Sequence, residues 1–432
     1  MIKKIQTVFA DAEHRHTAMN AILALGIRIL GAGMSFIFNL IIARQLGAEQ
    51  SGYFFLAFSL VMFLSAFARL GFDNTVLRFT SQNVKQGAVV RIILNFALQK
   101  VLPLASLIAI SLFLFAKPLA THIFNKPHLT GVFEMISPSI IGLSVVLIVA
   151  MSLQARHKIL TSIPCQNIAH LFLCSGLILF LTLDTAEDIA LYLSLSLGIS
   201  SSFFYWYSLR GLNNKGTRPN NTELWQSARP NWVITLMSQT LQWFGPIMIG
   251  VWLLAEDVAY FSVAQRIAML TSFILMAINL VVAPKFAAFK AVEDMLNIRK
   301  TALFSVRLLL ISALPIITFM LAFPSFLMGL FGDEFKEGAL ILQVLVLGQA
   351  VNVITGSVGY LLMMSGNERD LRFVTIFSGI TVVTLTCILT PLYGALGTAV
   401  ATAFSLAMQN LMAVYFVKKR LGFNTLKFWQ EI

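Results

Sequence analysis

The sequence predicts an all-α polytopic membrane protein, with about twelve transmembrane helices in two six-helix lobes around a central cavity. Of its 432 residues, 58% are hydrophobic and only 12% are charged, and the mean hydropathy is +0.81. A chain of this composition has too little polar surface to coat a globule, so lipid must be its solvent. Its apolar residues also fall in runs of about 20, the length that a helix needs to cross the hydrocarbon core.

Twelve apolar runs are long enough to be transmembrane helices. In chain order they are residues 21 to 43, 53 to 70, 92 to 115, 135 to 154, 161 to 182, 188 to 209, 231 to 253, 258 to 283, 302 to 323, 339 to 364, 372 to 390 and 395 to 417. The first run follows a charged N-terminal segment and is long enough to span, which favours a retained helix over a cleavable signal peptide. Prolines inside four of the runs predict kinks, at Pro103, Pro164, Pro246 and Pro315.

The distribution of Lys and Arg predicts the orientation, because these residues mark cytoplasmic loops. With Met1 inside, the inner segments hold 23 of the 31 basic residues. The outer loops then hold only Arg44, Lys117, Lys126 and Lys336, and four basic residues lie within helices. We therefore expect both termini in the cytoplasm, and we read the net charge of +12 as a topology signal rather than as nucleic-acid binding.

The two halves of the chain are related. Residues 46 to 57 (LGAEQSGYFFLA) match residues 253 to 264 (LLAEDVAYFSVA) at six of twelve positions, at the turn after each half's first helix. Six helices per half make this a parallel repeat, an arrangement typical of transporters that work by alternating access. The chain thus divides into an N-terminal lobe (1 to 209), a polar cytoplasmic linker (210 to 229) and a C-terminal lobe (230 to 432).

Several kinds of site are not encoded. Cys165, Cys174 and Cys387 fall inside predicted helices, where a thiol is most often just a small apolar residue. The six His residues lack the i, i+4 pairing of a helical metal site, and the sequence contains neither a P-loop nor a GxGxxG motif. We therefore expect no catalytic residue, no metal and no cofactor.

Three stretches carry a resemblance to a known family: ARQLGAEQSGYFFLAFSLVMFLSAFARLGFDNTVLRF (43 to 79), FGDEFKEGA (331 to 339) and TPLYGALGTAVATAFS (390 to 405). They resemble the polysaccharide flippases of the multidrug, oligosaccharidyl-lipid and polysaccharide exporter superfamily, above all the O-antigen and repeat-unit flippases. The likeness covers the whole chain, but its loose Gly, Ala and apolar motifs identify the superfamily better than the substrate.

The resemblance implies transport of an undecaprenyl-pyrophosphate-linked oligosaccharide from the cytoplasmic to the periplasmic leaflet of a bacterial inner membrane, as in lipopolysaccharide synthesis. The implied partners are this glycan, membrane lipids, and the polysaccharide polymerase and chain-length machinery. Nucleic acid is not among them.

Charges inside the membrane suggest how such a substrate would bind. Arg28, Lys100, Arg266 and Arg307 lie within predicted helices and away from their ends, whereas none of the 19 carboxylates does. Because a cation near the bilayer centre costs ~2.5 to 3.5 kcal/mol, these positions favour an aqueous cavity or an anionic ligand. Pyrophosphate suits them, since a guanidinium group can donate two parallel hydrogen bonds to it. Snorkelling to the nearer membrane surface is the alternative, most of all for Arg307. The superfamily's lipid-linked peptidoglycan-precursor flippases use arginines on their first and eighth helices, which implies substrate roles for Arg28 and Arg266.

Two further groups are candidates. Arg69, Asp73 and Arg78 cluster at the inner end of the second helix, where the arginines would attract phosphates to an entrance or simply form interfacial pairs. Neutral side chains at helical spacing would contact sugars or serve as interhelical hydrogen-bonding groups worth ~0.6 kcal/mol on average. The residues expected to contact the glycan are Asn39, Gln99, Gln239, Gln242, Gln349 and Asn352.

Two other functions stay open at this stage. A cation-coupled drug exporter of the same superfamily would resemble its relatives in having carboxylates within the membrane, and the predicted helices contain none away from their ends. A membrane enzyme that modifies polysaccharides would need a sizeable outer loop or a buried acid, base or nucleophile, yet the one helical histidine, His170, has no carboxylate near it in sequence. Energy coupling is likewise open between membrane potential, protons and downhill flux.

Overall fold

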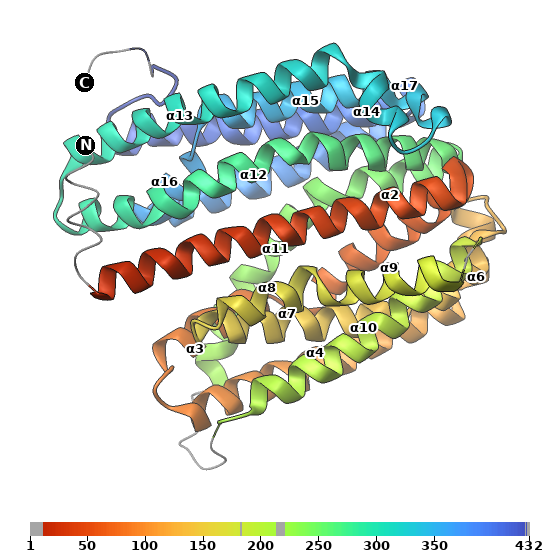
Figure 1. Ribbon diagram of the computed structural model, residues 1–432, viewed down its shortest axis with the longest axis horizontal. Coiled ribbons are helices and arrows are strands. Elements are labelled where there is room, and N and C mark those ends of the chain that lie inside the picture. The colour runs from red at the N-terminus through yellow and green to blue at the C-terminus, as the bar shows by residue number, and fades with distance from the viewer. Residues whose placement is uncertain (1–11, 182–183, 213–220, 428, 430–432) are drawn as a thin grey trace.

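A computed structural model describes residues 12–181, 184–212, 221–427 and 429, and within these ranges the regular elements are all helices. The prediction of an all-α membrane fold is confirmed. The helices lie roughly along one direction and form two groups, which spread apart toward the end of the molecule where the first described helix, α2 (Ala12–Ala68), begins (Figure 1). We call that end the near end and the opposite end the far end, and we propose that the two groups are the two predicted lobes.

The first group contains the elements that precede residue 213. They are α2 (Ala12–Ala68), α3 (Phe72–Gln82), α4 (Gly87–Leu114), α5 (Ala116–Pro118), the π-helical turn η1 (Leu119–Ile123), α6 (Leu129–Ile136), α7 (Ser139–Ala155), α8 (Ile159–Asn167), α9 (Ala169–Leu181) and α10 (Ala186–Leu209).

The second group contains the elements that follow residue 220. They are α11 (Asn221–Trp252), α12 (Ala255–Ala291), α13 (Met295–Ala322), α14 (Pro324–Gly329), the 3₁₀ turn η2 (Asp333–Gly338), α15 (Ala339–Thr355), α16 (Val358–Met364) and α17 (Glu368–Leu421). Residues 221–229 of the predicted linker belong to α11, and the division into two lobes and a linker remains a prediction. Residues 213–220 of the linker lie outside the described residues.

Eight described helices are long and apolar enough to cross a membrane, or nine if the bent pair α8 and α9 is one span. Two of the eight, α2 and α17, are interrupted by a glycine at positive φ, Gly47 (φ 70°) and Gly394 (φ 65°). Each break falls between two predicted helices. The residue at each break is glycine because only glycine adopts this left-handed backbone without strain. The predicted single helix from 339 to 364 is also interrupted, because Gly356 has a φ of 78°. The number of membrane crossings remains a prediction.

The two groups are joined at the far end by polar contacts. Arg44 Nε donates to the carbonyl oxygen of Leu330 at 2.8 Å, and the backbone N–H of Ala48 donates to Glu334 Oε1 at 2.7 Å. Lys126 Nζ donates to the carbonyl oxygen of Gly250 at 2.7 Å. We call these three pairs the far-end contact. Burial there lowers the pKa of the Lys126 ammonium.

The two groups of helices also meet closely at two further places. A Cβ atom added to Gly52 would lie 1.9 Å from the carbonyl oxygen of Ala255, so only glycine fits at this crossing of α2 and α12. Toward the near end, Trp232 Nε1 on α11 donates to the carbonyl oxygen of Phe67 at 3.0 Å. Helix α11 therefore stays against the first group along one side, while the groups spread elsewhere (Figure 1).

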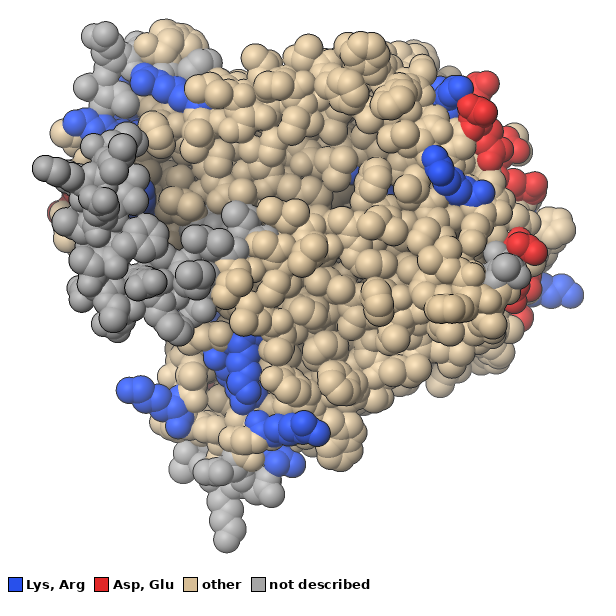
Figure 2. All heavy atoms as spheres, viewed as in Figure 1, with Lys and Arg blue, Asp and Glu red and all other residues tan. Residues whose placement is uncertain are grey.

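Charge is distributed unequally between the two ends. Figure 2 shows acidic side chains gathered at the far end, whereas most of the basic side chains in view lie toward the near end. Helix α2 begins at the more basic end. This unequal charge is the one from which the orientation was predicted, and the orientation remains a prediction.

Candidate functional site

A cavity of about 820 Å³ lies between the two groups. Its walls come from α2, α3, α7, α8 and α9 of the first group and from α11 and α12 of the second. Four charged side chains line it among the described residues: Arg28, Arg69, Asp73 and Arg266. Three guanidinium groups and one carboxylate give the lining a formal charge of +2, so the cavity favours an anionic ligand.

Arg28 enters the cavity from the first half of α2. The stripe predicted from the sequence, Arg28, Ala32, Ser35 and Asn39, lines the cavity along its whole length. Its spacing of 4, 3 and 4 residues puts all four on one helix face. On the same helix, Gly31 lies against the Ile168 side chain at the α8–α9 bend, since a Cβ atom there would be 3.4 Å away.

Arg266 enters the cavity from α12, on the opposite group. Its Cζ atom lies 4.3 Å from the centroid of the Phe55 ring, within the range of a cation–π interaction. The neighbouring Gln265 donates from Nε2 to the carbonyl oxygen of Gln242 at 3.0 Å, which ties α12 to α11 at this depth. Within the part of the chain that the structure describes, no carboxylate forms an ion pair with Arg266.

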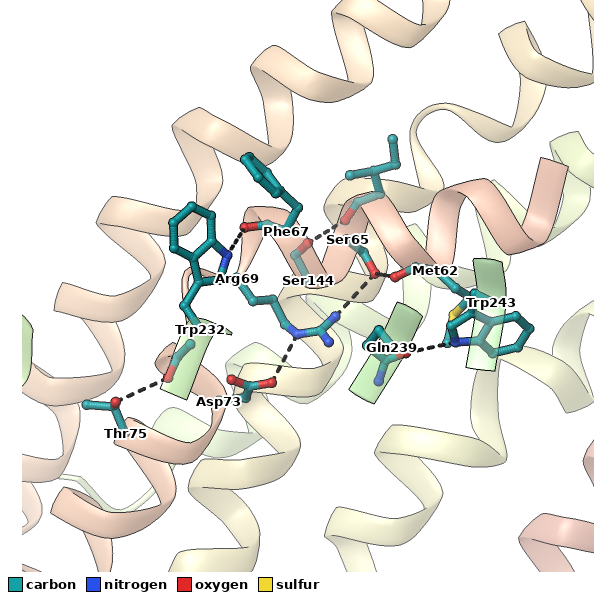
Figure 3. A network of polar contacts seen from close by, with 12 residues as sticks. Met62, Ser65, Phe67, Arg69, Asp73, Thr75, Ser144, Trp232, Gln239 and Trp243 are labelled. Atoms are coloured by element: carbon teal, nitrogen blue, oxygen red, sulfur yellow. Dashed lines mark hydrogen bonds and ion pairs between the residues drawn. The ribbon is translucent and has the colours of Figure 1, made fainter. Parts of the chain in front are cut away.

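Arg69 and Asp73 form an ion pair on the cavity wall (Figure 3). Arg69 is buried, its Nε lies 3.3 Å from Asp73 Oδ2, and its Nη1 donates to Ser65 Oγ at 3.2 Å. The cluster of Arg69 and Asp73 named from the sequence thus forms an ion pair, one of the two alternatives considered for it. The chain turns at Gly71 (φ 74°), so Asp73 lies in the first turn of a separate helix, α3, and faces the cavity from there.

Amide and aromatic groups form another part of the wall. Trp243 Nε1 donates to Gln239 Oε1 at 2.8 Å, and its ring packs edge-on against Phe58 at 5.7 Å (Figure 3). Gln242 and Asn39 also line the cavity. An aromatic surface beside several amides suits the apolar faces and hydroxyl groups of sugar rings.

Other predicted site residues lie outside the cavity lining. Lys100 and Gln99 are exposed on α4, where Lys100 Nζ lies 5.9 Å from the Phe96 ring, and Arg78 is exposed on α3. Arg307 is on α13, which does not contribute to the cavity. Gln349 accepts a hydrogen bond from Ser272 at 3.1 Å, which joins α12 to α15, and one from Asn352 at 3.2 Å, which lies within α15.

Sequence reasoning missed a polar face on the bent helix pair α8 and α9. Ser162, Gln166 and His170 follow one another at i, i+4 spacing and line the cavity with Asn167. That spacing was the available signal. His170 is buried, and its Nδ1 has no hydrogen-bond partner among the described residues.

Comparison with known proteins gives the family. Residues 18–290 match the family described as "Polysaccharide biosynthesis protein". The chain is 24% identical over 406 residues to the probable low-salt glycan biosynthesis flippase Agl15 of Haloferax volcanii. This alignment covers 93% of this chain and 82% of that protein. It is also 23% identical over 236 residues to the probable flippase AglR of the same organism, covering 54% of this chain and 49% of that protein.

Solved structures share the fold. An inward-facing multidrug resistance MATE family transporter of the MOP superfamily is similar with a TM-score of 0.71 and 14% identity, covering 93% of this chain and 98% of that one. The lipid II flippase MurJ in an inward closed conformation is similar with a TM-score of 0.70 and 14% identity, covering 92% of this chain and 87% of that one. The chain thus has the fold of a multi-pass membrane transporter, and its named relatives are flippases rather than enzymes.

Proposed function

Because the chain belongs to the polysaccharide biosynthesis protein family and, within it, to the polysaccharide flippases, we propose that it moves an undecaprenyl-pyrophosphate-linked oligosaccharide from the cytoplasmic to the periplasmic leaflet of a bacterial inner membrane. Alternating access would expose the cavity first to one side and then to the other. With the groups joined at the far end and spread toward the near end, the described conformation corresponds to a cavity facing the cytoplasm, if the near end is cytoplasmic.

The observation that carries the proposal is the charge of the cavity. Arg28 and Arg266 enter it from different groups of helices, and within the described residues neither forms an ion pair with a carboxylate. A pyrophosphate would supply the missing negative charge and can accept two parallel hydrogen bonds from each guanidinium. The Arg69–Asp73 pair would add a third guanidinium whose charge is already partly balanced.

The oligosaccharide would lie against the neutral part of the wall. Trp243 offers an aromatic face, and Gln239, Gln242 and Asn39 offer amides that pair with hydroxyl groups. Only the first part of a long glycan needs to fit in the cavity. The rest would extend toward the near end, where the two groups of helices spread apart. The lipid tail would remain in the bilayer.

A cation-coupled drug exporter is the second candidate, because the MATE transporter shares the fold. Asp73 is the one acidic residue among the described residues that line the cavity, and its carboxylate forms an ion pair with Arg69. A lining of net positive charge opposes the binding of cationic drugs or of a coupling cation. The cavity charge therefore favours an anionic lipid-linked substrate.

Deletion of the gene tests the proposal. Lipid-linked saccharides extracted from the membrane and identified by mass spectrometry should accumulate in the deletion strain with the pyrophosphate and the complete glycan repeat attached. Reintroduction of the wild-type gene should remove them. If the lipid-linked pool is unchanged by deletion while sensitivity to cationic drugs increases, the exporter function is correct and the flippase function is not.

A further inference from the structure

Phe55 is not exposed and does not line the cavity, yet it lies directly beneath the Arg266 guanidinium. It belongs to the second half of α2, eight residues beyond the break at Gly47, which is ~12 Å along a helix. Arg266 lies eleven residues beyond the start of α12, or ~16 Å. The contact thus lies several helical turns inward from the far end of both helices, on the wall of the cavity.

An aromatic face is a particular kind of partner for a guanidinium. The ring attracts the cation through its quadrupole but accepts none of its in-plane hydrogen bonds. Stacking therefore fixes the group while leaving its N–H donors available, whereas a carboxylate would have used them and neutralised the charge. In the described part of the chain, no hydrogen bond to an acceptor engages the Arg266 donors.

We propose that Phe55 is a positioning residue for phosphate recognition: its ring holds the Arg266 guanidinium over α2 so that the N–H donors are presented to a pyrophosphate in the cavity. This inference rests on the proposed function, because it takes the pyrophosphate as the ligand. It adds that the affinity for this group depends on a buried aromatic residue that does not touch the ligand.

The pairing also joins the two groups of helices. Phe55 belongs to the first group and Arg266 to the second, so the phosphate site is complete only while α2 and α12 meet at this depth. A conformation in which the two groups separate at the far end would remove the ring from beneath the guanidinium. The site would then hold phosphate less tightly, which is what release on the other side of a membrane requires.

The test is a titration of inorganic pyrophosphate into the purified full-length protein, followed by calorimetry. Phe55→Leu should weaken binding about three- to tenfold, the value of a partly desolvated cation–π contact. Phe133→Leu is the matched control, since Phe133 on α6 is equally buried, does not line the cavity and has no cation over its ring among the described residues. It should stay within about twofold of wild type.

Two further variants separate positioning from packing. Phe55→Leu combined with Arg266→Gln should bind no more weakly than Arg266→Gln alone, because the ring acts through the arginine. Replacing Phe55 with a ring-fluorinated phenylalanine keeps the shape but weakens the quadrupole, so binding should fall although the protein folds normally.

The outcomes are distinct. If the wild type binds pyrophosphate and neither Phe55→Leu nor fluorination weakens this binding, the positioning role is wrong and the proposed function stands. An equal loss in the Arg266→Gln background would show that Phe55 acts only through packing. Absence of wild-type binding would overturn the pyrophosphate site itself, and the inference with it.

Discussion

At the scale of single residues, Arg28 and Arg266 are the two cavity cations that the sequence already singled out, and they lie on opposite groups of helices. Their replacement by alanine should abolish surface glycan while leaving the amount of protein in the membrane near normal, because neither forms an ion pair with a described carboxylate. Lys100→Ala is the control, since Lys100 is exposed on α4 outside the cavity lining. Normal glycan display in both arginine variants would reject the cationic-cavity mechanism.

Replacement by lysine separates the geometry of these residues from their charge. If each arginine grips phosphate oxygens through paired hydrogen bonds, Arg28→Lys and Arg266→Lys should retain only partial transport, because lysine keeps the charge and loses the fork. Arg28→Glu should be inactive because it repels the phosphates. Flipping of a fluorescent undecaprenyl-pyrophosphate glycan in proteoliposomes measures this. Equal rates for wild type and Arg28→Glu would eliminate any direct role of the charge.

At the scale of elements, the length of the apolar runs was enough to predict a break between residues 43 and 53, which the structure places at Gly47. The rotation of each helix about its axis could not be predicted, because a lone polar face does not say which neighbour it meets. Arg28 and Lys100 looked alike in sequence, yet α2 turns its polar face to the cavity while Lys100 is exposed on α4. Asp73 lines the cavity because the turn at Gly71 returns α3 toward it, a change of direction that apolar runs do not predict.

The crossing of α2 and α12 gives an element-scale prediction. Gly52→Ala would place a methyl group 1.9 Å from the carbonyl oxygen of Ala255, so the two helices must move apart. We expect the variant to disfavour the described conformation and to admit water-soluble thiol reagents to a cysteine at Ala48, which wild type protects. Gly33→Ala, with nothing within 4 Å of the added Cβ, is the control and should change nothing. Unchanged labelling in the Gly52 variant would show that the crossing tolerates displacement without opening.

At the scale of the whole molecule, the unequal charge of the two ends predicts the topology. Acidic side chains gather at the far end in Figure 2, and basic residues mark cytoplasmic segments. With a single cysteine in a Cys-free background, Asn125→Cys should be labelled by an impermeant reagent in intact cells, and Asn214→Cys should not. Asn125 is exposed next to the far-end contact, whereas Asn214 lies in the predicted linker outside the described residues. The reverse labelling pattern would show that the protein has the opposite orientation in the membrane.

The far-end contact and the pyrophosphate should be coupled through the two groups. Glu334 accepts the N–H of Ala48, the first residue after the Gly47 break, and so caps the second half of α2 from the opposite group. Removing such a cap costs about 0.5 to 2 kcal/mol. Glu334→Ala should therefore shift the equilibrium toward far-end opening by about tenfold. Asp333→Asn is the control, because Asp333 pairs with Lys336 within the same turn.

Distances between spin labels at Asn125 and Glu337, both exposed at the far end but on different groups, measure this equilibrium. Glu334→Ala should enlarge the fraction of long distances, and pyrophosphate should reduce it, because a ligand shifts an equilibrium by its differential affinity for the two states. Linkage then requires that Glu334→Ala also weaken pyrophosphate binding, although Glu334 lies at the far end rather than in the cavity lining. If the label distances shift while the pyrophosphate affinity stays the same, the phosphate site does not depend on how the two groups meet.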